Sequence, residues 1–249
     1  MRGGADGGGC FPTGRHYPGI AHLLRVVAAG LADEFSSETP MSDVALVAID
    51  TETTGRDPAI DRIVEIACVV YRGGQTVDRR VWLVNPGRPI PKEAFDVHGI
   101  SDDDVQDKPE FAGIVDELLD ALAGTVPLAY NAEFDRNFIV AELQRSGHSR
   151  SEMPPACRKG VEWVDPLVWA RELQKYEKSK ALGAVCARLG IEIAQAHRAT
   201  DDAEAALAVL SAFSTDTRVP NTYGAFIQEQ RRLGRQFAEE RARWRSRSG

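Results

Sequence analysis

Apolar residues follow two different periods along the chain, and the order of these periods predicts an α/β fold. Five short runs are apolar or β-branched, as in buried strands: residues 44–49, 63–71, 76–84, 126–130 and 161–164. Five other segments repeat apolar residues at helical spacing: residues 114–122, 134–143, 167–173, 182–189 and 203–213. Three successive strands followed by alternating helices and strands predict a mixed five-stranded sheet flanked by helices.

The composition changes near both ends of this pattern and predicts three regions. Residues 1–42 are rich in glycine, and we expect a poorly structured extension with at most one short helix around residues 20–35. Residues 43–215 form the predicted catalytic domain. Residues 216–249 form an arginine-rich tail, predicted to be helical or disordered. A solvated helix or frayed end is slightly favoured over an arm that binds nucleic acid or a partner protein.

The composition excludes several classes of protein. The four cysteines form no C-x-x-C pair, which argues against a zinc ribbon and fits a reducing cytoplasm, the predicted location. No run approaches the roughly 20 apolar residues of a membrane span. The net charge of −7 argues against a protein that coats duplex DNA regardless of sequence. However, residues 231–249 carry +5, so residues 1–230 carry −12.

Acidic residues stand directly after the first predicted strand. Asp50 and Glu52 follow residues 44–49 and are two positions apart, so in a continuing strand both side chains point to the same face. Adjacent carboxylates repel each other, and a cation between them removes the repulsion. Since no thiolates are nearby, these oxygen ligands favour Mg²⁺ or Mn²⁺ over structural zinc.

Further candidates lie at the starts of two predicted helices. Asn131 and Asp135 follow the fourth strand, and His197 and Asp202 precede or begin the alanine-rich helix. Each of these residues could instead have an ordinary structural role: a helix cap, a charge that favours the helix dipole, or part of a capping box formed by the residues around Asp202. These alternatives do not explain why all the pieces occur together at strand and helix ends.

The segments together resemble the three motifs of the DEDD exonuclease family, in its histidine-containing branch, and are similar to the epsilon proofreading subunits of bacterial DNA polymerase III. The resemblance covers about residues 43–213. It implies a ribonuclease H-like fold. It extends beyond the acidic residues to four further segments: Arg62-Ile63-Val64-Glu65-Ile66-Ala67, Asn85-Pro86-Gly87, Val97-His98-Gly99-Ile100 and His197-Arg198-Ala199-Thr200-Asp201-Asp202-Ala203.

The resemblance implies a role for each candidate. Asp50, Glu52 and Asp202 would bind the metal ion that carries the attacking water, with Asp50 bridging to a second Mg²⁺ or Mn²⁺ ion and Asp135 supporting that second site. His197 would be the general base, for which an unperturbed pKa near 6.5 is suited. The implied contacts to the terminal nucleotide come from five residues: Thr51, Thr54, His98, Asn131 and Phe134.

The implied reaction is removal of mononucleotides from single-stranded or frayed 3′ ends of DNA, in proofreading or repair. Two alternatives stay open: trimming of RNA 3′ ends by the same chemistry, and a non-catalytic module that binds nucleic acid. Because no clamp-binding peptide is found after residue 213, recruitment by a DNA polymerase or a repair factor through the tail is a weaker expectation than the chemistry.

Overall fold

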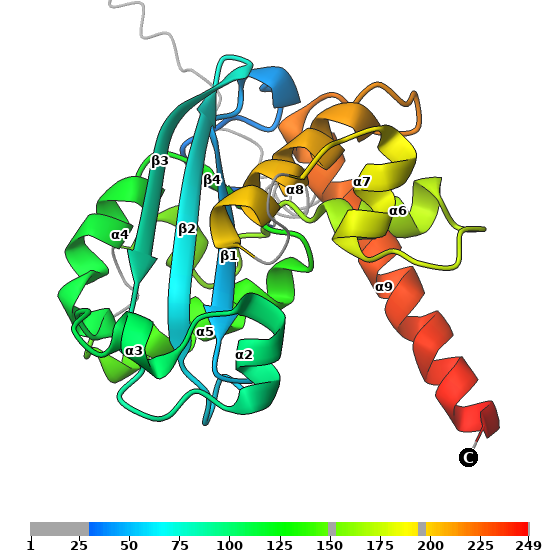
Figure 1. Ribbon diagram of the computed structural model, residues 1–249. Coiled ribbons are helices and arrows are strands. Elements are labelled where there is room, and N and C mark those ends of the chain that lie inside the picture. Colours follow the sequence, from blue (N-terminus) through cyan, green and yellow to red (C-terminus); the bar gives the residue numbers. More distant parts are fainter. Residues whose placement is uncertain (1–29, 149–152, 194–197, 249) are drawn as a thin grey trace, which may run out of the picture.

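The computed structural model describes residues 30–148, 153–193 and 198–248. Its sheet has the strand order β3-β2-β1-β4 (Figure 1). The strands are β1 (Leu46–Thr53), β2 (Ile63–Arg72), β3 (Gln75–Leu83) and β4 (Val126–Leu128). β1, β2 and β3 pair antiparallel, whereas β4 runs parallel to β1. The mixed sheet with flanking helices confirms the predicted fold class.

Helices form at the five predicted segments, in the C-terminal tail and at two further places. They are α2 (Lys92–His98), α3 (Asp102–Val105), α4 (Val115–Leu122), α5 (Ala132–Arg145), α6 (Pro166–Leu173), α7 (Leu182–Leu189), α8 (Ala199–Phe213) and α9 (Tyr223–Ser248). Short 3₁₀ turns lie at Met41–Asp43, Phe111–Gly113 and Pro155–Cys157. α2 and α3 were not predicted, since neither is long enough to show a helical period.

The prediction of a fifth strand at residues 161–164 is wrong. This segment makes a single parallel bridge, between Val164 and Leu128. Pro127 lacks the N–H that a longer ladder would donate to the Glu162 carbonyl. The Glu162 N–H donates instead to the Gly30 carbonyl (2.8 Å), so the pairing ends after one residue.

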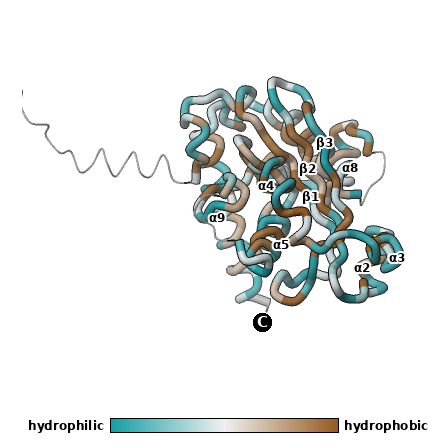
Figure 2. Tube along the Cα trace, turned by 90° about the vertical axis from the view of Figure 1, so that its left-hand side faces the viewer, coloured by the Kyte–Doolittle hydropathy of each residue, from teal (hydrophilic) through white to brown (hydrophobic). Residues whose placement is uncertain are grey.

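Side chains of β1 alternate between two hydrophobic cores, one on each face of the sheet. Leu46 and Ala48 join the core formed with α6, α7, α8 and the first turns of α9. Val47 and Ile49 join the core formed with α4 and α5. β1 and β2 carry long hydrophobic stretches, whereas α2, α3 and much of α9 are hydrophilic (Figure 2). β1 is therefore buried on both faces, as its continuous apolar run predicts.

The first turns of α9 pack against the core and against residues 30–42. Tyr223, Phe226, Ile227 and Leu233 are buried. The Tyr223 hydroxyl accepts a hydrogen bond from the Ala32 N–H (2.9 Å), and the Met41 N–H donates to the Asn221 carbonyl (2.8 Å). The domain boundaries at residues 42 and 215 stay predictions, and the helix considered within residues 20–35 lies mostly outside the described residues.

No helix in the described ranges combines the length and the hydrophobicity of a membrane span.

Gln230 joins α9 to residues 163–165, the segment that makes the bridge to β4. Its side-chain amide donates to the Trp163 carbonyl (2.8 Å) and accepts from the Asp165 N–H (2.8 Å), and the residue is 2% exposed. Gln230→Ala leaves these two backbone groups without their partner, so we expect a loss of about 2–3 kcal/mol in the free energy of unfolding. Urea unfolding measures this loss. Gln236→Ala, an exposed amide on the same helix, should change stability by less than about 0.5 kcal/mol; equal losses in both variants would contradict the role of Gln230.

Candidate active site

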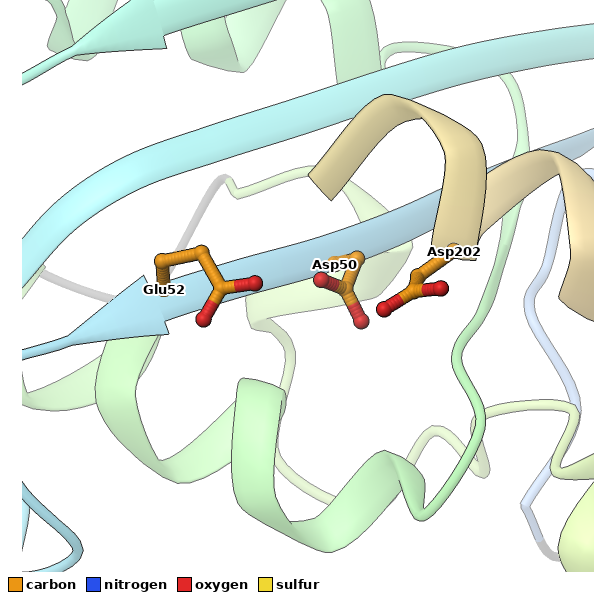
Figure 3. A group of neighbouring side chains, drawn as sticks. All are labelled: Asp50, Glu52 and Asp202. Carbon is orange, nitrogen blue, oxygen red and sulfur yellow. The ribbon is translucent and has the colours of Figure 1, made fainter. Parts of the chain in front are cut away.

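The alternation along β1 directs Asp50 and Glu52 to the face covered by α8. These residues continue the series of Leu46 and Ala48, which pack on the α8 side. Asp202, in the first turn of α8, points toward the same space (Figure 3). One carboxylate oxygen from each of the three residues lies within 4.8 Å of the others. This group could hold a metal ion, and it brings together residues from two elements 150 positions apart in the sequence.

Glu65 on β2 fixes the start of α8. It is 1% exposed and accepts hydrogen bonds from Arg198 Nη2 (2.8 Å) and from the Ala199 N–H (3.1 Å). Glu65 also pairs with Glu52 across β1 and β2. Glu65 was not predicted to have a role of its own. Its lone carboxylate within an apolar strand is the signal that could have shown one, because a buried charge needs a partner.

Asp135 approaches from the opposite face of β1. Thr51, between Asp50 and Glu52, points toward α5, and its hydroxyl donates to Asp135 Oδ1 (2.8 Å). Asp135 lies in the first turn of α5, where the helix dipole favours a negative charge, and it is buried. The described part of the candidate site therefore contains carboxylates from β1, α5 and α8.

Burial and mutual repulsion raise the pKa values of these carboxyl groups. Burial is the largest cause for Asp50, followed by the charges of Asp135, Glu52, Asp202 and Glu65, and its pKa lies well above the usual value. Burial and then Asp202 raise the pKa of Glu52 to about 8. Burial raises the pKa of Asp135 to about 7, against the hydrogen bond from Thr51. Such shifts are typical of groups that a cation or a proton must neutralise.

Asp165 holds the start of α5, which the sequence analysis did not anticipate. Its carboxylate accepts from the N–H groups of Asn131 (3.0 Å), Ala132 (3.2 Å) and Leu167 (2.9 Å). Asn131 has a left-handed backbone (φ 71°), which asparagine tolerates better than most residues. It stands at the N-cap position of α5, but its side chain makes no capping hydrogen bond.

The remaining predicted contact residues have defined surroundings. The Thr54 hydroxyl donates to Asp61 Oδ1 (3.3 Å) and accepts from the Arg62 N–H (3.0 Å), so it stabilises the loop after β1. A Cβ at Gly55 would lie 2.3 Å from the Asp61 carboxylate, which explains the glycine in the first motif.

His98 and Phe134 are held by their own elements. His98 ends α2, is buried, and accepts from the Ile100 N–H at Nδ1 (3.0 Å); burial lowers its pKa. Phe134 is partly buried, and its ring centre lies 4.9 Å from that of Phe138 in α5, with the two rings tilted by 46°. His197, the predicted general base, lies outside the described residues, directly before Arg198, which Glu65 binds.

The residues fit a hard divalent cation better than other ligands. The three convergent donors are carboxylates, and no cysteine of the described residues belongs to the group. Oxygen-only donors suit Mg²⁺ and Mn²⁺.

Comparison with known proteins agrees with this geometry. The exonuclease (RNase_T) family matches residues 47–210, a stretch that begins in β1 and ends in α8 and so includes every carboxylate of the site. The chain belongs to this exonuclease family. The resemblance drawn from the motifs is thereby confirmed, and the protein is a nuclease of the hydrolase class by family.

Relatives of this exonuclease include parts of large replication proteins. It is 32% identical over 204 residues to the DNA polymerase III PolC-type protein of Oceanobacillus iheyensis, covering 78% of this chain and 14% of the relative. It is 35% identical over 164 residues to the DNA polymerase III subunit epsilon of Treponema pallidum, covering 64% of this chain and 72% of the relative. The chain therefore spans about one seventh of the PolC-type relative.

Solved structures share the fold of this exonuclease. The E. coli ExoI–ssDNA complex aligns with a TM-score of 0.62 at 21% identity, covering 71% of this chain and 41% of that one. Exonuclease X in complex with 5′ overhanging duplex DNA aligns with a TM-score of 0.56 at 25% identity, covering 74% and 98%. Both support the ribonuclease H-like fold.

The raised pKa values predict how pH affects the metal-free exonuclease. Glu52 titrates near 8 and Asp135 near 7 in the folded state, against ordinary values of 4.5 and 3.8. Between about pH 5 and pH 8 the folded state therefore binds more protons than the unfolded state. We expect the free energy of unfolding in EDTA to fall as pH rises through this window.

Urea unfolding at pH 5.5, 6.5 and 7.5 measures this dependence. Glu52→Gln should flatten it, whereas Glu93→Gln, an exposed change on α2, should leave it unaltered. Added Mg²⁺ should restore stability most at pH 7.5, because a cation stabilises the ionised carboxylates. A rise in stability with pH in EDTA, or identical slopes for all three proteins, would contradict the crowding of the carboxylates.

Proposed function

We propose that this exonuclease removes mononucleotides from the 3′ ends of DNA, acting on single-stranded or frayed ends by metal-assisted hydrolysis. The observation that carries the proposal is the convergence of Asp50, Glu52 and Asp202 within 4.8 Å, in a chain that matches the exonuclease family across these residues. Asp135 adds a fourth buried carboxylate from the other face of β1.

The carboxylates are proposed to bind two Mg²⁺ or Mn²⁺ ions. Asp50, Glu52 and Asp202 would hold one ion, and Asp50 and Asp135 would help to hold the second. When bound, such ions supply Lewis-acid activation of the phosphodiester and of the attacking water. The rigid attachment of α8 through Glu65 fixes the direction of the Asp202 carboxylate, which supports its assignment as a ligand.

His197 is proposed as the general base. It accepts a proton from the attacking water at an imidazole nitrogen, for which its ordinary pKa near 6.5 is suited. Its place in the sequence supports the role, because it precedes the anchored Arg198 by one residue and Asp202 by five.

The terminal nucleotide is proposed to lie between β1 and the start of α5. Glu52 orients the 3′-hydroxyl, and Thr51 and Thr54 contribute backbone contacts, since both hydroxyls already make internal hydrogen bonds. Asn131, Phe134 and His98 form the walls around the sugar and base. Stacking on such walls is tolerant of base identity, so we expect little sequence preference.

DNA is the proposed substrate because of the relatives. The matched proteins are named as DNA polymerase III components, and the E. coli ExoI structure is a complex with ssDNA. The proposed biological role is proofreading or repair, and a polymerase or repair factor is the proposed protein partner.

The test compares two adjacent residues of α8. Asp202→Asn removes a proposed ligand and should lower cleavage at least about 100-fold. Asp201→Asn makes the same change one position away, outside the carboxylate group, and should retain activity within a few-fold. The assay digests 5′-labelled single-stranded and 3′-recessed DNA with Mg²⁺, Mn²⁺ or EDTA, and the products are resolved by length.

Identical RNA oligomers provide the second arm of the assay. A metal-dependent ladder that shortens from the 3′ end of DNA supports the proposal. A ladder on RNA alone changes the substrate and keeps the chemistry. Equal activity of the two α8 variants, or cleavage in EDTA, refutes the assignment of Asp202 and the use of metal.

The variant His197→Ala tests whether His197 acts as the general base or as a metal ligand. We expect kcat to fall by about 100-fold or more, since general acid–base catalysis contributes roughly 10²–10⁴. The concentration of Mn²⁺ at half-maximal activity should change little, because a base is not a ligand. A parallel loss in both quantities would instead make His197 a ligand.

A further inference from the structure

A groove lies between α6 and α9, away from the carboxylate group. It consists of two hollows of about 560 and about 660 Å³, which adjoin at Arg171 and Arg241, since both residues line each of them. Figure 1 shows α9 passing beside α6 and continuing beyond the body of the molecule. We call the two hollows together the α6–α9 groove.

The lining of the α6–α9 groove has a net positive charge, whereas the chain as a whole has a net negative charge. Its lining contains eight cationic and five acidic side chains. The whole chain has 30 lysines and arginines against 37 aspartates and glutamates. One of the five acids, Asp165, already accepts three backbone N–H groups, which offset its charge. The groove is therefore an electropositive strip on an acidic protein.

Three arginines of the groove have no acidic partner within the described part of the chain. Arg171, Arg235 and Arg241 take part in no ion pair there, whereas Arg243 on the same helix as Arg235 pairs with Glu239 (3.4 Å). Arg171 is half-buried and close enough to Arg241 that burial and this second positive charge lower its pKa. Like charges held together in this way are stabilised by a bound anion.

One end of the α6–α9 groove meets the proposed substrate pocket. Asn131 and Ala132, at the start of α5, line it. Asp135 follows three residues later, on the first turn of the same helix, and binds Thr51 between the proposed metal ligands. The groove therefore reaches the start of the helix that carries Asp135.

The other end of the groove is aromatic. Phe237 and Trp244 line it, and Trp244 is 70% exposed. Exposed indole rings are uncommon on a purely solvated helix, and aromatic faces beside a cationic track are the usual surface for unstacked bases. The helix between Arg231 and Trp244 spans about 20 Å, which is long enough to follow several nucleotides.

We propose that the α6–α9 groove binds the sugar–phosphate backbone of the single-stranded DNA that lies 5′ of the terminal nucleotide. This inference rests on the proposed function and adds the path of the substrate. Arg171, Arg235 and Arg241 contact phosphates, and Trp244 stacks on a base. Neutralisation of phosphates by arginines releases counterions, which makes this binding dependent on salt and independent of sequence.

The test measures binding of 5′-labelled dT12 in EDTA, so that the strand is not cut. Arg235→Gln/Arg241→Gln should weaken binding about tenfold at 50 mM salt. It should also reduce the slope of log K against log salt by about 1.4, because each phosphate of a single strand that an arginine neutralises adds about 0.7 to the slope. Arg72→Gln/Arg243→Gln removes the same charge from outside the groove lining and should leave the slope unchanged.

A second readout separates the groove from the chemistry. The nitrophenyl ester of thymidine 5′-monophosphate, hydrolysed with Mn²⁺, is too short to enter the groove, so the groove variant should cleave it at the wild-type rate while losing activity on dT12. Equal salt slopes for both double variants overturn the proposal and leave the groove to a protein partner. Loss of ester hydrolysis in the groove variant overturns it also, because the effect then arises at the carboxylates.

If the proposed function itself is wrong, the same assays give a different result. The wild-type protein would then cleave neither the ester nor dT12, although the salt slope of dT12 binding would still distinguish the groove variant from its control.

Discussion

The crowding of carboxylates at the end of β1 is the constraint around which the rest of the protein is arranged. Asp50 and Glu52 share a strand face with the buried residues Leu46 and Ala48, so the hydrophobic core extends directly into a charged site. Asp202 and Asp135 approach from α8 and α5. Without a cation their repulsion opposes folding, which is why their pKa values are raised. The surrounding structure must supply the opposing stability.

Hydrogen bonds to buried backbone groups provide part of this stability. Glu65 accepts from the first N–H group of α8, that of Ala199, and Asp165 accepts from the N–H groups of Asn131 and Ala132 at the start of α5. Gln230 of α9 binds the backbone on both sides of residue 164, next to Asp165. A continuous series of contacts therefore runs from α9 through Asp165 to Asp135 and Thr51. The C-terminal helix contributes to the position of the site although it lies beyond the segment matched to the exonuclease family.

The distribution of charge connects the site to its proposed substrate. A net charge of −7 would repel a polyanion, but four of the carboxylates lie where divalent ions are proposed to bind. The positive charge gathers in the α6–α9 groove and along α9. An acidic protein can thus present a local surface suited to a DNA strand.

The sequence by itself determined the elements of the exonuclease and most of its candidate residues. Alternating and helical periods located four strands and five helices, because burial of one face imposes a period on the sequence. The motifs identified the family before any geometry was known. They also placed Asp50 and Glu52 on one strand face, since that depends only on the pleat of a strand.

Only the tertiary structure decided which groups meet across the fold. The fifth strand failed because Pro127 lacks an N–H and Gly30 accepts the Glu162 N–H, contacts between segments distant in sequence. The roles of Glu65, Asp165 and Gln230 were not visible because each side chain binds the backbone of another element. The α6–α9 groove arises from the same cause: its charges come from segments about 100 residues apart, and packing alone brings them together.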